Sequence, residues 1–457
     1  MEKNALRDGR QKSLEYSIKD GAAFSIMTGF GEQYFTPLAI ELGASNMEIG
    51  LLASLPPFIA SLPQLFTSRV TAQLKSRRKL ILVAVLLQVL TWFPLAAIPL
   101  FDGSNAVLLL IFFVSLYFMF GQFANPTWNS LMGDLVNEEA RGRFFGMRNK
   151  LTGAVAFVSI FLAGYMLSLF SKETVLYGFS FIFLVALVAR IISWRYLSLM
   201  EDPPMKEEGA VAFSFTQYLK RLRKTNYGRF ALYYGLMNFS VYIAAPFFAV
   251  YMLRDLHFTY FEYTIATAAM SLTTFLAMTY WGNLADRYGN KKIISLCGTS
   301  LAVIPLIWLF SSDLVSVILV QILAGLVWSG FNLSAINMVY DNVRPENRTR
   351  VFAYHNILTA SAIFIGAIAG AVIAGTNAGY GIFYSGLEML FLISGILRLM
   401  TSVLFLPQIK ERRTVEPISE KDFFIKYSGT GPAIGLTYRA VTGLHKSIRH
   451  IRKTDNR

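Results

Sequence analysis

The stretch that decides the fold occurs twice in this chain: Asp134–Asn149 reads DLVNEEARGRFFGMRN, and Asp341–Asn356 reads DNVRPENRTRVFAYHN. Aligned at an offset of 207 residues without a gap, seven of their sixteen positions are identical. A second match joins RRKLIL at Arg77–Leu82 to NKKIIS at Asn290–Ser295, at an offset of 213. Two matches with nearly one period indicate a chain built from two similar halves.

The composition is that of a chain whose solvent is largely lipid. Of its 457 residues, 54% are hydrophobic and 15% are charged, and the mean hydropathy is +0.47. This balance does not suit a water-exposed surface. The single cysteine, Cys297, excludes a disulfide framework and a cysteine metal cluster. The polar N-terminus lacks the pattern of a cleavable signal peptide, so we expect the first apolar span to direct insertion.

Twelve apolar segments are long enough to span a bilayer, six in each half of the chain. Backbone polar groups in hydrocarbon must be paired within the segment, so these spans are predicted to be helices, and long unbroken runs exclude a β-barrel. The predicted spans are residues 21–41, 47–70, 80–101, 105–129, 149–170, 174–198, 228–253, 260–284, 291–311, 313–337, 350–375 and 382–406.

Basic residues predict the orientation of these spans in the cell membrane. With the N-terminus in the cytoplasm, all of the 42 Lys and Arg lie on the cytoplasmic side except Lys172 and Arg254 outside and Arg190 and Arg398 within spans. The net charge of +14 is therefore a topology signal and not a nucleic-acid footprint. Both termini are expected to be cytoplasmic.

The spans and their connections predict five parts: a cytoplasmic N-terminus at 1–20, a six-helix bundle at 21–199, a linker at 200–227, a second bundle at 228–406 and a basic cytoplasmic tail at 407–457. Within the linker, Phe213–Lys224 can form a basic amphipathic helix on the anionic inner leaflet. Ala440, Leu444, Ile448 and Ile451 share one helical face of the tail, which is either a second surface helix or a solvated basic segment.

One loop of the second half identifies a family. GNLADRYGNKK at Gly282–Lys292 resembles the loop signature of the major facilitator superfamily, Gly-x-x-x-Asp-Arg-x-Gly-Arg/Lys-Lys. The resemblance covers residues 16–406 and implies two six-helix bundles, related by a pseudo-twofold axis, that alternate access to a midplane site. The first-half copy at Ser68–Lys79 departs from the signature, because Gln73 replaces the acid and Ser76 replaces the glycine.

Charged residues beside this loop and in the duplicated stretches are predicted to form a cytoplasmic gate. Gly289 permits a tight turn between antiparallel helices, and an acid such as Asp286 can face a helix N-terminus. The family resemblance implies that such a cluster locks the inner side when the cavity opens outward, although the same charges can simply anchor topology. The predicted gate residues are Asp134, Arg141, Arg143, Asp286, Arg287, Gly289, Lys291, Asp341, Arg348 and Arg350.

Glu32 is the leading candidate for proton coupling or substrate contact, because a carboxyl group at membrane depth is costly and by default functional. Counted along a helix from Ala22, it lies about 15 Å deep, near the middle of a hydrocarbon core about 30 Å thick. Gln33 is adjacent, and Gly29 and Gly31 leave space beside the backbone. The alternative is a protonated Glu32 that hydrogen-bonds a neighbouring helix for packing alone.

The resemblance also implies that the first, fourth, seventh and tenth spans line the cavity. By depth and polarity, the predicted cavity residues are Gln122, Asn125, Trp128, Asn238, Tyr242, Trp328 and Asn332. Asn125 and Asn332 are related by the offset of 207, which fits two walls of one cavity or two structural hydrogen bonds. Arg190 and Arg398, on spans that are peripheral in the family, are expected to be structural, with side chains that snorkel. Glu388 has no assigned role.

These observations predict a secondary transporter that moves a small organic solute by alternating access, coupled to protons through Glu32. A proton-driven multidrug antiporter is the first alternative, although the fifth span lacks the proline of that group's signature. A non-transporting sensor and a lipid scramblase are alternatives from another class. No enzyme, cofactor, metal site or ATP-binding loop is predicted, because the four histidines are assigned to loops or the tail. The expected partners are the solute, protons and the bilayer, without nucleic acid, for a monomer.

Overall fold

The first half of the chain folds into helices connected by short loops. The computed structural model describes residues 2–101, 103, 105–136, 141–204, 215–343, 348–375 and 386–416. The helices of the first half are α1 (Glu2–Phe30), α2 (Phe35–Glu41), α3 (Asn46–Ser61), α4 (Thr67–Leu74), α5 (Arg77–Ala97), α6 (Ala106–Leu135), α7 (Arg141–Ser168) and α8 (Val175–Ser198). Short 3₁₀ turns at Glu32–Tyr34 and Pro63–Leu65 interrupt the first and second predicted spans.

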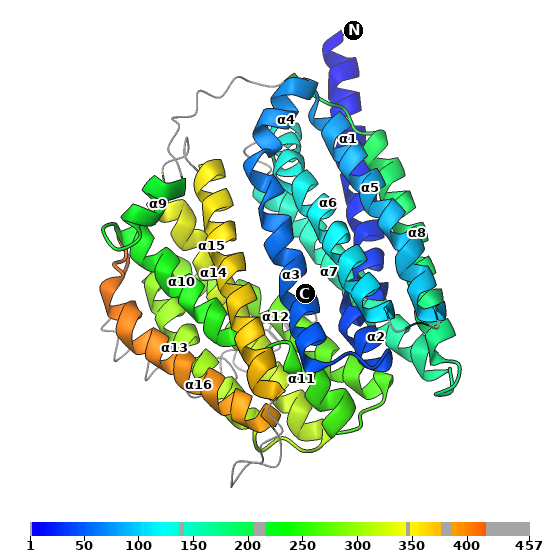
Figure 1. Ribbon diagram of the computed structural model, residues 1–457. Coiled ribbons are helices and arrows are strands. Elements are labelled where there is room, and N and C mark those ends of the chain that lie inside the picture. Colours follow the sequence, from blue (N-terminus) through cyan, green and yellow to red (C-terminus); the bar gives the residue numbers. More distant parts are fainter. Residues whose placement is uncertain are drawn as a thin grey trace, which may run out of the picture.

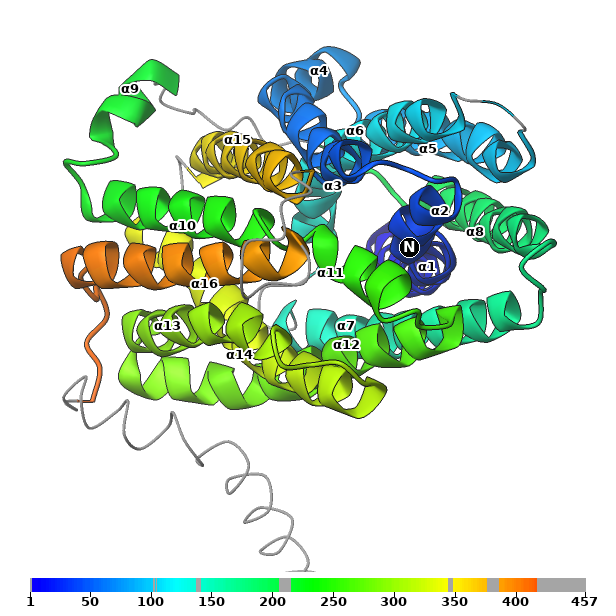
Figure 2. The same cartoon turned by 60° about the horizontal axis from the view of Figure 1, so that its bottom comes forward.

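The second half repeats this arrangement after a short surface helix. Its elements are α9 (Phe215–Arg221), α10 (Asn226–Tyr242), α11 (Phe247–Val250), α12 (Tyr260–Tyr288), α13 (Asn290–Trp308), α14 (Leu314–Asn342), α15 (Arg348–Ala374) and α16 (Gly386–Phe405). A π-helical turn at Tyr251–Asp255 continues α11. Figure 1 shows the two groups of helices, and Figure 2 shows them side by side from another direction.

Each of the twelve predicted spans contains helix, and nine helical segments among the described residues are long and apolar enough to cross a membrane. The predicted spans at α1, α3 and α12 do not meet this criterion of length and apolarity, and their sequences explain why. The N-terminal part of α1 is polar, α3 has 16 residues before the chain turns at Pro63, and α12 is rich in Ser and Thr. In α12, Thr264, Thr267, Thr273 and Thr274 donate to carbonyl groups four residues earlier, which pairs these hydroxyls within the helix.

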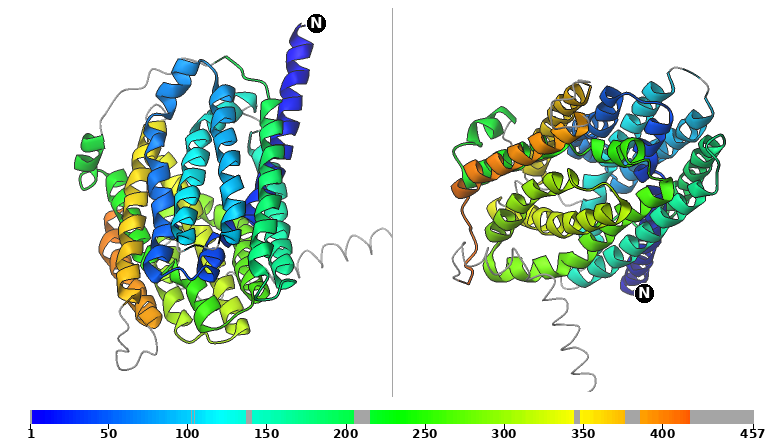
Figure 3. Two further views of the ribbon diagram at one scale, coloured as in Figure 1. Left: turned by 45° about the vertical axis from the view of Figure 1, so that its right-hand side comes forward. Right: turned by 90° about the horizontal axis from the view of Figure 1, so that it is seen from below.

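The buried apolar residues show how the two bundles are joined. One cluster contains residues of both halves, including Phe35, Trp92, Phe247 and Trp308. Two further clusters stay within one half each, around Leu131 in the first and Phe331 in the second. We call the face with the N-terminal end of α1, the start of α5 and residues 409–416 the terminal face, and the other the far face. The bundles are therefore packed together toward the far face and have separate cores toward the terminal face (Figures 1 and 3).

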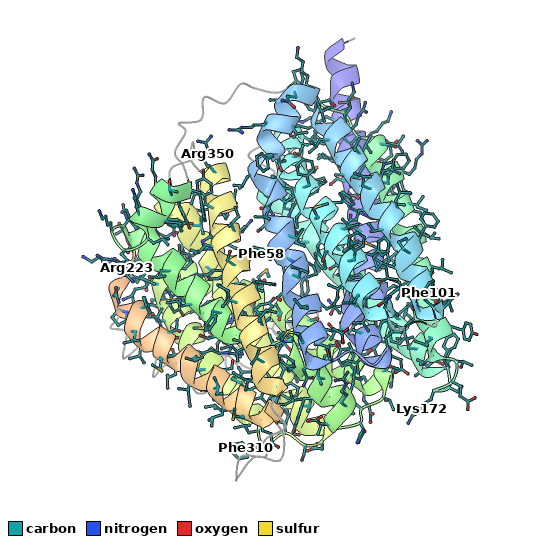
Figure 4. All side chains as sticks on the ribbon, in the orientation of Figure 1. Phe58, Phe101, Lys172, Arg223, Phe310 and Arg350 are labelled. Carbon is teal, nitrogen blue, oxygen red and sulfur yellow. The ribbon has the colours of Figure 1, made fainter. Side chains whose placement is uncertain are left out.

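Two pairs of helices make the contact between the bundles: α3 with α15, and α7 with α12. Phe58 of α3 stacks on Phe364 of α15 with ring centroids 5.2 Å apart, and Phe58 is labelled between the bundles in Figure 4. On the second seam, the Tyr34 hydroxyl donates to the Ile160 carbonyl at 2.8 Å and lies 3.0 Å from the Thr264 hydroxyl. α3 and α12 are equivalent helices of the two halves, and so are α7 and α15. The second seam is therefore the symmetry-related copy of the first.

Polar contacts reinforce the far face. Asn46 Nδ2 donates to the Ala374 carbonyl at 3.0 Å, the Tyr260 hydroxyl donates to Glu41, and Arg254 donates to the Ala44 carbonyl. All three join a residue of the first half to one of the second. The far face is thus closed by hydrogen bonds as well as by apolar packing.

The eleventh predicted span packs closely against α10. A Cβ atom at Gly366 would lie 2.3 Å from the Phe239 carbonyl oxygen, and one at Gly370 would lie 2.1 Å from the Ile243 carbonyl oxygen. The missing side chains let the α15 and α10 backbones approach each other, which is the usual role of small residues at helix contacts in membranes.

The predicted amphipathic helix of the linker is present in shortened form as α9, which ends at Arg221 before a turn leads into α10. Tyr218 anchors it, because its buried ring packs on Phe215, Tyr227 and Tyr354. Burial raises the pKa of the Tyr218 hydroxyl to about 12. The helix predicted in the tail, at Ala440–Ile451, lies outside the described residues.

Candidate functional site

The first span breaks where the sequence places its acidic residue. A Cβ atom at Gly31 would lie 2.0 Å from the ring of the fully buried Trp92, so a side chain there would collide with that ring. The chain then makes the 3₁₀ turn Glu32–Tyr34 before α2 begins. The space expected beside Gly31 is therefore filled by Trp92. Short 3₁₀ segments within a helix often mark functional positions, and this one holds the Glu32 side chain apart from the regular helix.

Glu32 lines a cavity of about 370 Å³ that lies inside the first bundle. The lining comes from five helices, α1, α5, α6, α7 and α8, and from the turn that carries Glu32. Its polar side chains are Asp20, Thr28, Glu32, Gln88, Tyr117, Gln122, Asn125, Trp128, Arg148 and Arg190. A membrane bundle that gathers two acids, two arginines and several amides around one cavity has the composition of a binding site rather than of a packing core.

Tyr117 of α6 holds the Glu32 carboxyl group. Its hydroxyl donates to Glu32 Oε1 at 2.5 Å, and the tyrosine side chain is fully buried. The Tyr117 ring makes edge contacts with Phe35 and Trp92, at centroid distances of 5.8 and 5.2 Å. Packing therefore fixes the ring, and the ring in turn fixes the hydroxyl that faces Glu32.

Arg190 of α8 points into the bundle, so the expectation that it snorkels toward the surface is wrong. It is 5% exposed, and its Nε and Nη2 donate to Gln88 Oε1 at 2.9 and 2.5 Å. Gly121 makes room for Gln88, because a Cβ atom there would lie 2.6 Å from Gln88 Nε2. The side chain of Gln88 thus accepts from the buried guanidinium of Arg190. No sequence pattern indicated Gln88.

Asp20 and Arg148 form a second charged group in the lining. Arg148 Nη2 lies 3.7 Å from Asp20 Oδ2, and Arg148 Nε donates to the Ser17 carbonyl at 3.1 Å. The guanidinium lies 4.6 Å from the ring centroid of Trp128, within the range of a cation–π contact. Sequence reasoning missed both residues, because they stand at the ends of predicted spans, where charges are ordinary.

The three predicted residues of the fourth span, Gln122, Asn125 and Trp128, line this same cavity with Glu32. Gln122 also lies 3.5 Å from Gln64 Nε2, and Gln64 Oε1 accepts from Asn356 Nδ2 at 2.9 Å. Gln64 thereby connects the lining of the first bundle to α15 of the second.

The other predicted cavity residues do not line this cavity. Gln33 is exposed beside it in the turn, and Asn238 of α10 is buried and donates to the Tyr234 carbonyl of its own helix. Tyr242 and Trp328 are partly buried, and Asn332 is exposed on α14. Their contact with substrate remains a prediction.

At the terminal face of the first bundle, Arg77 at the start of α5 joins two acids. Its Nη1 donates to Asp134 Oδ2 at 2.7 Å, and its Nη2 donates to the Pro203 carbonyl at 2.8 Å. Its Nε lies 3.7 Å from Asp202 Oδ1, too far for a hydrogen bond. Asp202 itself accepts from Ser76 Oγ at 2.6 Å, at the N-cap of α5.

The second bundle reproduces this arrangement with a segment that follows α16. Glu411 accepts from the backbone N–H of Lys291 at 2.9 Å, as Asp202 does beside α5. Arg413 joins Asp286, at 3.3 Å, and Asp341, at 3.0 Å, while Arg287 pairs with Glu416 at 2.6 Å. The acid of the loop signature thus faces Arg413 and not a helix N-terminus. No sequence pattern indicated residues 411–416 as partners.

Gly289 stands at the turn between α12 and α13, as predicted, with a φ of +92° that favours glycine. Arg350 lies in the first turn of α15. The side chains of Arg141, Arg143 and Arg348 lie outside the described residues. Where the structure describes both partners, every ion pair joins two residues of the same half. Of the residues predicted to lock the terminal face, Asp134, Asp286, Arg287 and Asp341 are therefore paired within their own bundles.

Arg77→Ala and Arg413→Ala are expected to lower the free energy of unfolding by different amounts. Arg77 is 3% exposed, and Arg77→Ala leaves Asp134 and Asp202 without their cation, at a cost of about 2–4 kcal/mol. Arg413 is 38% exposed, and its partners Asp286 and Asp341 are 78% and 12% exposed. Water reaches the guanidinium and screens both pairs, so Arg413→Ala should cost about 1 kcal/mol, less than Arg77→Ala. Unfolding of the purified variants, followed by tryptophan fluorescence, measures both. Equal losses would contradict the assigned difference in burial.

The structure contradicts two further expectations from the sequence, one about His355 and one about Arg398. His355 was assigned to a loop, but it lies in α15, is 7% exposed and stacks on Phe230. Arg398 of α16 is 2% exposed rather than snorkelled, and it donates to Ser394 Oγ and to the Leu301 carbonyl, both at 3.0 Å. Among the described residues, no group of three or more His, Cys, Asp or Glu side chains could hold a metal ion.

Two related six-helix bundles, joined along α3–α15 and α7–α12 around polar, membrane-buried residues, define a multi-pass membrane protein of the transporter class. The sequence profile described as Major Facilitator Superfamily matches residues 22–240 and 230–453. The chain belongs to the major facilitator superfamily, and it is a membrane transporter of that family.

Comparisons with individual proteins agree with this assignment. The multi-drug resistance efflux pump PmrA of Streptococcus pneumoniae serotype 4 is 25% identical over 385 residues, which cover 80% of this chain and 89% of the relative. The crystal structure of a D-xylose-proton symporter has a TM-score of 0.68 at 11% identity and covers 89% of this chain and 99% of that one. A bacterial homologue of the iron transporter ferroportin, in an inward-facing state, has a TM-score of 0.64 at 14% identity, over 89% and 100% of the two chains.

Proposed function

We propose that this chain is a proton-coupled transporter of a small organic solute in the cell membrane, with both termini in the cytoplasm, and that Glu32 carries the proton. The observation that carries the proposal is the position of Glu32, a carboxyl group on a break in the first span that lines a polar cavity inside the membrane bundle. A carboxyl group in such a place can exchange a proton with cavity water, and its charge changes what the cavity binds.

The described conformation supports alternating access. The bundles share one apolar core toward the far face and have separate cores toward the terminal face. With the terminal face in the cytoplasm, as the basic residues indicate, this is an inward-facing arrangement, like that of the ferroportin homologue. Rocking of the two bundles about the α3–α15 and α7–α12 seams would open the far face and close the terminal one.

The predicted cytoplasmic gate would form in the outward-facing state. In that state the terminal faces approach each other, and Asp134, Arg141, Arg143, Asp286, Arg287, Gly289, Lys291, Asp341, Arg348 and Arg350 would form the closing contact. Arg413 and Glu416 hold Asp286, Asp341 and Arg287 in the described state. An exchange of partners between the two states would let the same charges stabilise each of them.

A multidrug cation/proton antiporter is the second candidate. Four aromatic side chains, Phe24, Tyr117, Phe118 and Trp128, share the cavity with two acids, a combination that suits flat organic cations. The relative PmrA, a multi-drug efflux pump, covers 80% of this chain. In such an antiporter the cation and the proton would occupy the cavity in turn, with Glu32 holding the proton.

Transport by the purified chain in proteoliposomes tests both candidates. Ethidium, uridine and D-xylose serve as probes, with and without an imposed pH gradient. We expect at least one probe to accumulate only when the gradient is present, and ethidium to do so for the antiporter. A lipid scramblase would instead move labelled lipid without any gradient, and a sensor would bind a probe without moving it. Either result, with no gradient-driven flux, would overturn the proposal.

A further inference from the structure

The cavity contains a second buried carboxyl group, Asp20, that the proposed function does not use. Asp20 lies in α1 and is 4% exposed. Its Oδ1 accepts from the Ser193 hydroxyl at 2.7 Å, and its Oδ2 lies 3.7 Å from Arg148. Asp20 precedes Glu32 by twelve residues, roughly 18 Å along a helix of 1.5 Å rise per residue. The two acids therefore occupy separate parts of one cavity.

Hydrogen bonds connect the two acids across three other helices. From Asp20, Ser193 Oγ accepts in turn from Arg190 Nη1 at 2.8 Å, and Arg190 donates to Gln88 Oε1. Gln88 Nε2 then donates to the Tyr117 carbonyl at 3.2 Å. The hydroxyl of that same tyrosine donates to Glu32. Gln88 reaches the backbone carbonyl of Tyr117, and the hydroxyl of the same residue reaches Glu32, so the contacts from Asp20 to Glu32 are continuous through this one tyrosine.

Arg190 lies between the acids without an ion pair to either. Its hydrogen bonds end on the neutral Gln88 and Ser193, yet it interacts electrostatically with both Asp20 and Glu32. The charged groups facing Asp20 are Arg148 from α7 and Arg190 from α8, and Glu32 faces Arg190 and the Tyr117 hydroxyl of α6. When one acid takes up a proton, it no longer repels the other acid electrostatically, which couples their titrations.

The second bundle shows that these acids are not needed merely to neutralise a buried arginine. Arg398 follows Arg190 by 208 residues and is as deeply buried, at 2% exposure. It is held by Ser394 and by backbone carbonyls, and the structure assigns it no ion pair within the described residues. A neutral environment therefore suffices for an arginine at this position. Burial of an arginine at this position therefore does not by itself account for the two acids of the first bundle.

We infer that Asp20 is a second proton-binding site of the transporter, coupled to Glu32 through Arg190 and Ser193. The inference rests on the proposed function and deepens it: one site lies near the terminal face and the other at the break of the first span. Binding converts a carboxylate to a carboxyl group, with the proton delivered by a hydronium ion of the cavity that leaves as water. Arg148 then loses its partner Asp20 and is available to an anionic group.

Infrared spectroscopy of the purified chain in lipid tests this without any substrate. The pH is varied, and the C=O stretching band of protonated carboxyl groups is recorded for wild type, Asp20→Asn, Glu32→Gln and the control Glu15→Gln, an exposed acid on α1. The chain has 28 Asp and Glu residues, and among their titrating bands we expect one that is lost only in Asp20→Asn and another that is lost only in Glu32→Gln. In Glu32→Gln the midpoint of the Asp20 band should also move by about one pH unit. The Glu15 variant should match wild type.

A second variant guards against misfolding. Ser193→Ala keeps the acid and removes one hydrogen bond to it, so the Asp20 band should remain with a shifted midpoint. Unchanged bands in both Asp20→Asn and Ser193→Ala would overturn the inference. If the midpoint of the Asp20 band is unchanged in Glu32→Gln, the two acids are not coupled.

Ethidium transport separates this inference from the proposal about Glu32. If Asp20→Asn transports ethidium down a pH gradient as wild type does, and keeps both bands, Asp20 is not a proton site and Glu32 can still be one. If Glu32→Gln transports normally and Asp20→Asn does not, Asp20 is the proton site and the role of Glu32 is wrong.

Discussion

Glu32→Gln is expected to abolish pH-gradient-driven accumulation of the probe that wild type accumulates, which is ethidium for the antiporter, while the variant still binds that probe. Glutamine keeps the shape of the side chain and can still accept from the Tyr117 hydroxyl, but it cannot gain or lose a proton. A gradient of one pH unit is worth about 1.4 kcal/mol for each proton moved, which supports about tenfold accumulation with one proton per solute. The variant should equilibrate the dye to a ratio near one. Dye fluorescence in proteoliposomes measures this ratio.

The matched control for this result is Glu15→Gln, which removes an exposed acid of the same helix. It should accumulate ethidium about tenfold, as wild type does. Accumulation by Glu32→Gln at the level of this control would exclude Glu32 as the proton carrier. Loss of binding together with accumulation would show that Glu32 contacts the dye instead of coupling it.

Gly164→Val is expected to shift the transporter out of the described conformation. A Cβ atom at Gly164 of α7 would lie 2.0 Å from Thr264 Oγ1 of α12, on the seam that closes the far face. Relieving such an overlap costs about 1–3 kcal/mol, which changes the ratio of two states about 5- to 150-fold. The seam opens in the other state, so that state does not bear the cost.

Two pairs of spin labels measure this shift. Phe101 and Phe310 are exposed on the far face, one in each bundle, and Arg223 is exposed toward the terminal face (Figure 4). Lys75 is exposed at the end of α4, two residues before the start of α5 on the terminal face of the first bundle. In Gly164→Val the first distance should lengthen and the second should shorten. Gly146→Val is the control, because nothing lies within 4 Å of a Cβ atom at this other glycine of α7. Identical distances in the two variants would show that the α7–α12 contact does not hold the far face closed.

The fold could be predicted from the sequence because its signals are long and repeated. Apolar segments of spanning length must be helical in lipid, and the doubled stretches at Asp134 and Asp341 placed the helices in two related halves. Helix ends were predicted less well. The α6 helix continues to Leu135 and α14 to Asn342, because backbone hydrogen bonding continues into polar sequence beyond the hydrocarbon.

The site could be predicted only in part. Glu32, Gln122, Asn125 and Trp128 were found because a polar residue in an apolar run is conspicuous, and all four line one cavity. Gln88 and Arg190 are equally polar within spans, but which way a helix turns them depends on packing by partners such as Gly121. The turn at Glu32 depends on Trp92, sixty residues away in the chain. Such tertiary contacts leave no local sequence pattern.

The ion pairs at the terminal face could not be predicted from the sequence either. The duplicated acids Asp134 and Asp341 are paired, but by Arg77 in one half and by Arg413 in the other. Arg77 aligns with Asn290, whose Nδ2 donates to Asp341 Oδ2 at 2.8 Å. Arg413 comes from a segment after the last helix and has no counterpart in the alignment of the halves. Two bundles with similar sequences thus reach the same pairing with different arginines.

The reverse experiment tests proton coupling most directly. Because coupling at equilibrium is reciprocal, an ethidium gradient imposed on proteoliposomes without a pH gradient should drive protons across the membrane. A pH-sensitive dye trapped inside the vesicles reports that flux. We predict a pH change with wild type and none with Glu32→Gln. Ethidium flux through wild type without any pH change would contradict the account.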